Sequence, residues 1–262
     1  MMKINLENKR ALVGGSTQGL GKAIALELAN CGASVTLMAR NEEKLKATLN
    51  ELNTNYHQKH SYLVVDFNDF TSFENITTSF FKNNTVDILV NNTNGPDAGG
   101  VFEKEIKDYQ KAFDLLFKTT THLTMLALPQ MKLNNFGRII NTASVSVKIP
   151  LLHLALSNTI RSAVIMWAKT LSIEVAPYGI TVNNILTGIF DTERIKQLNE
   201  FQAKAKNSTL EENLKVITND IPMGRLGKPE EFGNLVAFLA SNYAAYITGA
   251  NIPIDGGFIK SI

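Results

Sequence analysis

The strict alternation of two kinds of segment along the chain constrains its fold most. Seven short runs rich in β-branched and aliphatic residues are predicted to form buried strands: Arg10–Val13, Ser34–Met38, Tyr62–Val65, Ile88–Val90, Arg138–Asn141, Thr181–Ile185 and Asn251–Ile254. Six longer segments repeat apolar residues at helical spacing and are predicted to be helices: Gly19–Cys31, Glu42–Leu52, Phe70–Lys82, Ile106–Leu133, Ser157–Ala176 and Pro229–Leu239. Strands that alternate with helices form a parallel sheet, because each crossover packs a helix on the sheet. We therefore predict an α/β fold with a doubly wound, seven-stranded parallel sheet and helices on both faces.

One segment, at about 190–220, departs from this alternation. It is polar and follows the sixth predicted strand. Open α/β sheets bind ligands outside the carboxyl ends of their strands, so we expect a mobile helical lid over a substrate here. A surface insertion is the alternative. No Pro/Ser-rich linker or internal repeat divides the chain, and residues 1–262 are therefore predicted to form a single domain.

Composition and charge argue against several classes of partner. The formal net charge is +2 and the basic residues do not cluster, so no nucleic-acid partner is expected. No apolar run is long enough to span a membrane, and the first residues lack the apolar stretch of a signal peptide. A single cysteine, Cys31, fits a reducing compartment, which leads us to expect a cytoplasmic protein. The four histidines lack the spacing of metal ligands, and no metal site is expected.

A glycine-rich turn follows the first predicted strand, with the spacing Gly-x-x-x-Gly-x-Gly. Glycine permits a turn with positive φ and lets a diphosphate approach the backbone, while the following helix N-terminus favours its negative charge. A merely structural turn is the alternative, but the place between the first strand and the first helix favours a Rossmann-type dinucleotide site. The residues expected to contact the cofactor here are Gly15, Ser16, Thr17, Gln18, Gly19, Leu20 and Gly21.

The end of the second predicted strand bears on the choice of cofactor. NAD binders place an acidic residue near this point to bind the ribose 2′-hydroxyl. Here Ala39 takes that place and Arg40 follows. A guanidinium pairs well with a 2′-phosphate, so we predict NADP(H), with NAD(H) as the less favoured cofactor. The alternative is that Arg40 is only the surface start of the next helix.

Further segments along nearly the whole chain match the motifs of one enzyme superfamily. Besides the glycine turn they are Asp66, Asn91–Gly95, Gly137–Ser144, Ala176–Asn183, Thr187–Thr192, Pro229–Glu231, Thr248-Gly249 and Asp255–Gly257. With these motifs the chain resembles the short-chain dehydrogenase/reductase superfamily. Among the better-known members it is most similar to the 3-oxoacyl-acyl-carrier-protein reductases. Thr93 and Asn94 depart from the usual Asn-Asn-Ala-Gly segment.

The resemblance implies further cofactor contacts and an assembly. The implied contacts are Asp66 and Phe67 at the adenine, Asn92, Thr93 and Asn94 after the fourth strand, and Thr187, Gly188, Ile189 and Thr192 around the nicotinamide amide. The substrate would be a small molecule or an acyl thioester, and the assembly a homo-tetramer or homo-dimer.

The catalytic residues of that superfamily are an Asn, a Ser and a Tyr-x-x-x-Lys pair, and this chain departs from them. Ser144 occupies the serine position. Counting back from Ala176 places Ser157 at the tyrosine position and Arg161 at the lysine position, and Leu116 falls at the asparagine position. The chain therefore resembles a variant subfamily that carries Ser-Asn-x-x-Arg in place of Tyr-x-x-x-Lys.

This departure leaves the proton donor open. A serine hydroxyl is a far weaker acid than a phenol with a pKa near about 10, and arginine stays protonated above about pH 12. In one interpretation Ser144, Ser157 and Arg161 form an oxyanion site, and water or a neighbouring residue, with Lys148 and His153 as candidates, supplies the proton. In another, an activated substrate needs little beyond hydride placement. The alternatives without a catalytic role are that Ser157 caps a helix, that Arg161 and Lys148 are surface cations, and that His153 is a packed loop residue.

The sequence thus predicts an NADP(H)-dependent oxidoreductase that acts on a carbonyl/alcohol pair, with a 3-oxoacyl thioester as a candidate substrate. The competing hypothesis is a nucleotide-binding protein with reduced or no carbonyl reductase activity, acting as a sensor or a partner subunit.

Overall fold

One parallel sheet organises the computed structural model, which describes residues 3–205 and 207–260. Its seven strands lie in the order β3-β2-β1-β4-β5-β6-β7, and every neighbouring pair is parallel. The strands are β1 (Arg10–Gly14), β2 (Ser34–Ala39), β3 (Ser61–Val64), β4 (Ile88–Asn91), β5 (Gly137–Thr142), β6 (Ile180–Thr187) and β7 (Asn251–Ile254). The strand order reverses between β1 and β4, as in a doubly wound sheet. The predicted fold class is confirmed.

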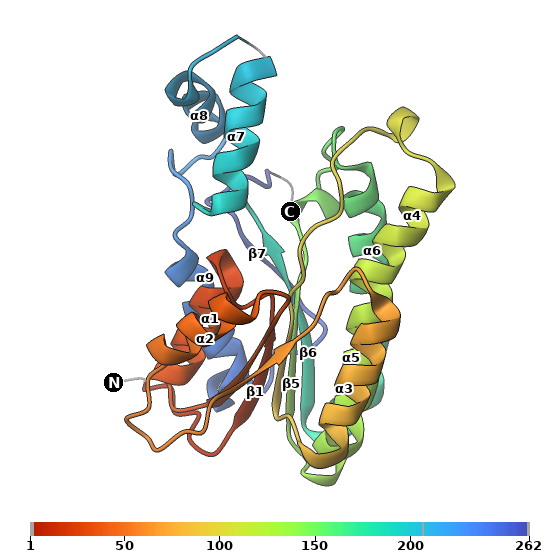
Figure 1. The fold of residues 1–262 in the computed structure, drawn as a ribbon, viewed down its shortest axis with the longest axis vertical. Coiled ribbons are helices and arrows are strands. Elements are labelled where there is room, and N and C mark those ends of the chain that lie inside the picture. The colour runs from red at the N-terminus through yellow and green to blue at the C-terminus, as the bar shows by residue number, and fades with distance from the viewer. Residues whose placement is uncertain (1–2, 206, 261–262) are drawn as a thin grey trace.

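Helices cover both faces of the sheet (Figure 1). They are α1 (Gly19–Asn30), α2 (Glu42–Glu51), α3 (Phe70–Asn83), α4 (Ile106–Phe113), α5 (Thr119–Leu133), α6 (Ala155–Val175), α7 (Glu193–Ala205), α8 (Leu210–Asn219) and α9 (Pro229–Ala240). One apolar core lies between the sheet and α1 and α9, and a second lies between the sheet and α3, α5 and α6. Gly233 lets α9 approach α1, since a Cβ there would stand 2.9 Å from the Ala23 carbonyl oxygen.

The long helix predicted at Ile106–Leu133 forms over this span, with one irregularity. A π-helical turn, Asp114–Lys118, separates α4 from α5. The Thr119 hydroxyl bonds back to the Leu115 carbonyl oxygen at 2.5 Å within this region. Single π turns inside α-helices are frequent at functional sites. This one contains Leu116, which lines a cavity described below.

Helices also form in the polar segment at about 190–220, as predicted. α7 and α8 project beyond the carboxyl ends of the strands (Figure 1). Buried amides join the two helices: Asn199 donates to the Leu210 carbonyl oxygen at 3.0 Å, and Asn213 donates to Asn199 Oδ1 at 2.6 Å. Thr209 and Glu212 cap α8 reciprocally. The function of this pair as a lid stays a prediction.

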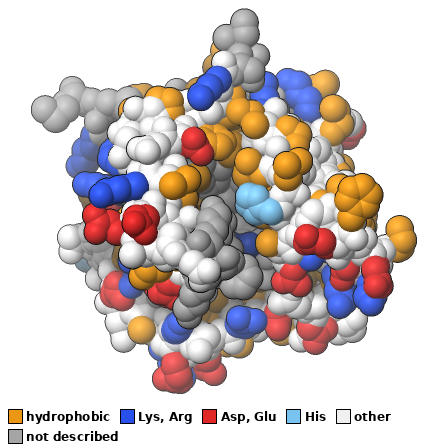
Figure 2. Space-filling model, turned by 90° about the horizontal axis from the view of Figure 1, so that it is seen from above, with side chains coloured by type: hydrophobic (Ala, Val, Ile, Leu, Met, Phe, Trp, Pro, Cys, Tyr) orange, Lys and Arg blue, Asp and Glu red, His pale blue; other side chains and the backbone are white. Residues whose placement is uncertain are grey.

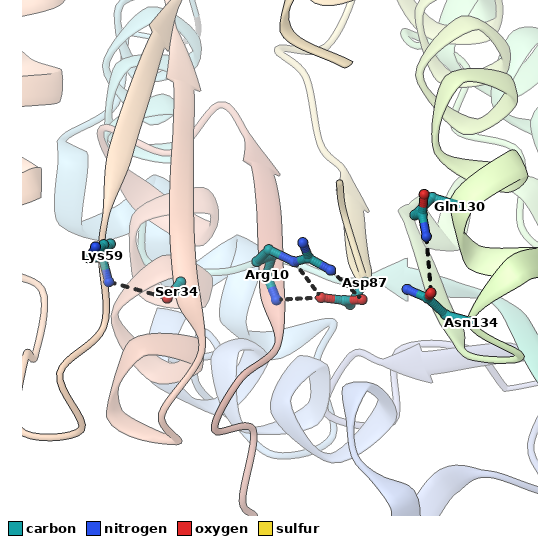
Figure 3. Close-up of polar contacts among 6 residues, drawn as sticks. All are labelled: Arg10, Ser34, Lys59, Asp87, Gln130 and Asn134. Atoms are coloured by element: carbon teal, nitrogen blue, oxygen red, sulfur yellow. Dashed lines mark hydrogen bonds and ion pairs between the residues drawn. The ribbon is translucent and has the colours of Figure 1, made fainter. Parts of the chain in front are cut away.

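Polar contacts lie near the opposite, amino-terminal ends of the strands (Figure 3). The backbone N–H and the guanidinium Nε of Arg10, at the start of β1, donate to Asp87 Oδ2 at 2.9 and 3.0 Å just before β4. Lys59 N donates to Ser34 Oγ at 3.2 Å at the start of β2. At the end of α5, Gln130 Nε2 donates to Asn134 Oδ1 at 3.0 Å. Within the described part of the chain, no helix has the length and apolar character needed to cross a bilayer.

Candidate active site

The glycine turn lies at the carboxyl end of β1, where the sheet order reverses. Gly15 and Gly19 adopt positive φ, at +58° and +53°. A Cβ on Gly21 would stand 2.1 Å from the Gly15 carbonyl oxygen, so no larger residue fits this turn. The Gln18 side chain does not cap α1, which leaves the first amides of that helix to a ligand. Thr17, Gln18 and Leu20 lie on the accessible side of the turn.

Ser16 has a structural role in the turn. Its side chain is fully buried, and its hydroxyl accepts a hydrogen bond from the Met38 backbone N–H at 2.9 Å. This bond ties the glycine turn to the end of β2. Ser16 can therefore reach a cofactor only through its backbone.

Arg40 and Asp66, which the sequence placed at the ribose and the adenine, lie in one hollow. This hollow, of about 540 Å³, is also lined by Asn41 and Val65. Arg40 is exposed, so its guanidinium is free to meet a phosphate. Phe67 is different: its side chain is 6% exposed and packs on Phe73 with ring centroids 5.5 Å apart. Any contact of Phe67 with a cofactor would come from its backbone.

Asn92 forms the opposite wall of the turn. Its Nδ2 donates to the Gly14 carbonyl oxygen at 2.9 Å, and a Cβ on Gly14 would stand 2.3 Å from the Asn92 carbonyl oxygen. The next residue, Thr93, donates its hydroxyl proton to the carbonyl oxygen of Asn94 at 3.1 Å. The loops after β1 and β4 therefore pack closely and are hydrogen-bonded to each other at the point where the strand order reverses.

The segment after β6 lies over the glycine turn from the other side. Thr192 is close enough that a Cβ on Gly19 would stand 3.3 Å from its methyl carbon. Gly188 N donates to the Ile254 carbonyl oxygen at 3.0 Å, and the Ile189 carbonyl oxygen accepts from Gly227 N at 3.0 Å. The buried Thr187 hydroxyl has no partner among the described residues. The residues at the carboxyl ends of β1, β2, β4 and β6 fit a dinucleotide.

Ser157 and Arg161 form a bonded pair on α6. Arg161 Nε donates to Ser157 Oγ at 3.2 Å, and Nη1 donates to the Thr142 carbonyl oxygen at the end of β5. Burial, and to a smaller extent the positive charge of Arg194, lower the pKa of Arg161 to about 10. The guanidinium is still charged at neutral pH. The helix starts after Leu154, so the alternative in which Ser157 caps it is wrong.

Arg161 lines a small cavity of about 10 Å³ at the ends of β4 and β5; its other lining residues are Asn91, Thr93, Leu116, Thr120, Asn141, Thr142, Ala143 and Val164. Asn91 Oδ1 and Thr142 Oγ1 are buried there without a partner among the described residues. Arg161 is the only charged side chain in this lining.

A ladder of asparagine amides crosses the sheet beside this cavity. Asn91 donates to Asn141 at 2.8 Å, Asn141 donates to Asn184 at 2.9 Å, and Asn184 donates to Asn251 at 2.8 Å. These residues are register partners on β4, β5, β6 and β7. Sequence reasoning missed the ladder, although asparagines at or near the ends of neighbouring predicted strands were a usable signal.

No hydrogen bond among the described residues joins the remaining catalytic candidates to the Ser157–Arg161 pair. Ser144 Oγ accepts from Ser146 N at 3.1 Å in the turn after β5. Lys148 follows that turn with an exposed side chain. His153 is also exposed, so the expectation of a packed histidine is wrong; its neighbour Leu152 is exposed as well, which shows that the leucines around it do not all mark a buried segment. Ser144 keeps its predicted place at the carboxyl end of β5.

Arg194, at the start of α7, is a site residue that sequence reasoning missed. Its Nη1 and Nη2 donate to the carbonyl oxygens of Gly95 and Pro96 at 3.3 and 3.4 Å. The side chain therefore reaches from the segment after β6 to the loop after β4. In the sequence Arg194 is one basic residue of a polar segment, and nothing there distinguishes it from its neighbours.

Hydrophobic side chains gather on one half of the face above the strands (Figure 2). Val101, Phe102 and Leu152 are exposed in the loops after β4 and β5. An isolated parallel β-bridge between Gly99 and Leu154 joins these two loops. We call the three exposed residues Val101, Phe102 and Leu152 the apolar lip. In the part of the chain that the structure describes, no cluster of three or more His, Cys, Asp or Glu residues is arranged to hold a metal.

Comparisons with known proteins place this geometry in a family. Residues 15–259 match the family model described as enoyl-(acyl carrier protein) reductase. The 3-oxoacyl-acyl-carrier-protein reductase FabG of Rickettsia felis is 33% identical over 256 residues, which cover 98% of this chain and 99% of that protein. The NADPH-dependent reductase BacG of Bacillus subtilis is also 33% identical and covers 98% of this chain and 100% of its own length.

Two solved structures have the same fold across their whole length. YwfH, an NADPH-dependent reductase involved in bacilysin biosynthesis, superposes with a TM-score of 0.90 at 33% identity and covers 97% of this chain and 99% of its own. The L-sorbose reductase of Gluconobacter frateurii, in complex with NADPH and L-sorbose, superposes with a TM-score of 0.92 at 28% identity and full coverage of both chains. The chain belongs to the short-chain dehydrogenase/reductase superfamily of oxidoreductases.

Proposed function

We propose that this protein is an NADP(H)-dependent oxidoreductase that interconverts a carbonyl compound and its alcohol. The observation that carries the proposal is the arrangement at the reversal of the sheet, where the glycine turn follows β1 and Arg40 follows β2 beside a hollow. Relatives named as NADPH-dependent reductases, and a neighbour that holds NADPH, support the choice of cofactor.

The glycine turn and the α1 N-terminus would hold the diphosphate, because backbone N–H groups and the helix dipole both favour an anion there. Arg40 would bind the 2′-phosphate, and Asp66 would lie near the adenine. Thr187 and Thr192 would hold the nicotinamide amide. When bound, the reduced nicotinamide supplies the hydride that reaches the carbonyl carbon.

Arg161 would stabilise the negative charge that develops on the substrate oxygen. Hydrogen bonds to Ser157 and to the Thr142 carbonyl oxygen fix the position of the guanidinium, so it needs no reorganisation during the reaction. Ser144 and Ser157 would donate hydrogen bonds to the same oxygen. Lys148, exposed at the end of the turn that Ser144 begins, is our candidate for the proton donor.

A 3-oxoacyl thioester is one candidate substrate. The relatives named as 3-oxoacyl-acyl-carrier-protein reductases support it, as does the apolar lip of Val101, Phe102 and Leu152. Similarity also supports a homo-tetramer or homo-dimer in the cytoplasm. Met166 and Ile173 on α6 are exposed and could serve as the contact, whereas Trp167 packs inside against Phe117. We further propose one domain over residues 1–262, with α7 and α8 as its lid.

The test is NADPH oxidation by the purified protein with a panel of ketones, 3-oxoacyl thioesters and oxo acids. We expect saturable turnover, and Arg161→Met should lower kcat by about 10²- to 10³-fold, the effect of removing one oxyanion donor. Arg225→Met, an exposed arginine paired with Glu231, is the matched control and should retain activity.

The competing function is a nucleotide-binding protein without carbonyl reductase activity. The replacement of the Tyr-x-x-x-Lys pair by Ser157 and Arg161 favours it, because neither residue readily releases a proton. Tight NADPH binding without turnover of any compound in the panel would establish this alternative. Turnover that survives Ser144→Ala unchanged would remove Ser144 from the mechanism.

A further inference from the structure

We infer that the substrate carries a carboxylate, which Arg161 and Arg194 bind together. This inference rests on the proposed function, since it names the class of carbonyl compound that the site selects: a small oxo acid and the corresponding hydroxy acid. Neither residue has a carboxylate partner in the described part of the chain.

The first step is the incomplete bonding of Arg161. A guanidinium offers five N–H donors in a planar fork. Only Nε and Nη1 of Arg161 have partners among the described residues, a hydroxyl and a backbone carbonyl oxygen, and both are neutral. A buried charge without a counter-charge is costly, so a site that retains one is suited to a ligand that brings the opposite charge.

The second step is the position of Arg194. Its guanidinium lies against Gly95 and Pro96, which follow Thr93 in the loop after β4, and Thr93 lines the same cavity as Arg161. The two arginines come from different elements, α6 and α7, and the positive charge of Arg194 lowers the pKa of Arg161. Both side chains therefore lie near the loop that follows β4.

The third step is the shortage of acidic groups around this pair. The cavity lining has no Asp or Glu. Asp97 is the acid whose charge acts on Arg194, but it is exposed and forms no ion pair with Arg194 within the described residues. Lys196, two residues further along α7, already pairs with Asp191 at 3.6 Å. Among the described residues, Arg161 and Arg194 therefore have no carboxylate within ion-pair distance.

A carboxylate matches this arrangement better than a neutral acyl group does. Its two oxygens accept parallel N–H bonds from a guanidinium fork, and charge-assisted bonds of this kind are roughly twice as strong as neutral ones. Arg194 lies beside the site where the substrate would be, because Thr192, two residues before it, covers the glycine turn. The carboxylate would then orient the carbonyl group toward Ser144 and Ser157.

The experiment compares matched acids and esters. NADPH oxidation is measured with acetoacetate and 2-oxooctanoate, with their methyl esters, and with a neutral 3-oxoacyl thioester. We expect a higher kcat/KM for each acid than for its ester. Arg194→Gln should lower kcat/KM for the acids by about 10- to 100-fold, the effect of losing a charge-assisted hydrogen bond, while the value for the esters changes little. Arg194→Lys should restore part of the preference, and Lys196→Gln is the matched control.

The outcomes separate this inference from the proposed function. Turnover of the esters or of the thioester at or above the rate of the acids would overturn the inference and leave the oxidoreductase assignment standing. A rise in the KM for NADPH alone in Arg194→Gln would also overturn it, because Arg194 would then bind the cofactor. If no compound turns over, the proposed function fails. Calorimetry then measures the binding of 2-oxooctanoate and of its ester to the protein with NADPH. Equal affinities for the two compounds would refute the carboxylate site.

Discussion

Replacing Asn141 with leucine would break the amide ladder in its buried middle. The Asn141 side chain accepts from Asn91 at 2.8 Å and donates to Asn184 at 2.9 Å, and all three residues are almost fully buried. Leucine has a similar size but neither donor nor acceptor. Asn184 Oδ1 would lose the one partner that the structure gives it, while Asn91 Nδ2 would keep only Thr124 at 3.2 Å.

The magnitude follows from these lost partners. A buried polar group left without a hydrogen bond costs about 1–3 kcal/mol, so Asn141→Leu should lower the free energy of unfolding by about 2–5 kcal/mol. For a chain of this size, each kcal/mol corresponds to a shift of roughly 2–4 °C in Tm, which predicts a fall of roughly 4–20 °C. The assays are thermal unfolding by circular dichroism and equilibrium unfolding in urea.

The control is an exposed amide pair. Gln130 Nε2 donates to Asn134 Oδ1 at 3.0 Å on the surface of the molecule, so water can replace the lost partner. Asn134→Leu should therefore cost under about 1 kcal/mol. Equal destabilisation by Asn141→Leu and Asn134→Leu would refute the reasoning, because burial would then not decide the cost of a broken amide bond.

Three further predictions concern the cofactor site and pH. Gly21→Ala would place a Cβ 2.1 Å from the Gly15 carbonyl oxygen, so NADPH binding measured by fluorescence should fall at least about tenfold; unchanged binding would contradict the turn geometry. Arg40→Ala should weaken NADPH far more than NADH in the same assay, and equal losses would remove Arg40 as the 2′-phosphate ligand. Burial lowers the pKa of His122 below its usual 6.5, so the folded state favours the neutral ring. This contribution to stability is complete above about pH 6.5 and is lost as the pH falls below it, so urea unfolding at pH 7.5 and 5.5 should show a smaller acid loss in His122→Gln than in the wild type. An identical pH dependence in the two proteins would contradict this assignment.

The sheet and its helices could be predicted because the sequence pattern and the tertiary environment agree. Runs such as Ile88–Val90 are apolar on both faces, and their position in the middle of a covered sheet requires this. The boundaries shifted by a residue or two, as at the start of α6, where Ala155 precedes the predicted Ser157. The π turn at Asp114–Lys118 could not be predicted, because its residues have the same helical spacing as the turns on either side.

The cofactor turn could also be predicted, since backbone geometry demands glycine at particular positions there. Side-chain burial was harder to predict. Ser16 and Phe67 stand beside ligand-binding positions in the sequence, yet the fold turns both side chains inward, one to Met38 N and one to Phe73. Spacing along a loop gives the position of a backbone, but the direction of a side chain depends on elements that are distant in the sequence.

Arg161 shows what the structure adds to the sequence. The resemblance aligns Ser157 and Arg161 with a tyrosine and a lysine, which predicts the loss of an acid and of a proton relay. In the structure the two residues bond to each other and to the end of β5, so the exchange also leaves a buried cation with unused donors. A pKa of about 10 keeps that cation charged through the neutral range, whereas a general acid must give up its proton within it. The site is therefore suited to binding negative charge, on the substrate as bound and on the oxygen that forms during reduction. The proton must come from a group outside the Ser157–Arg161 pair.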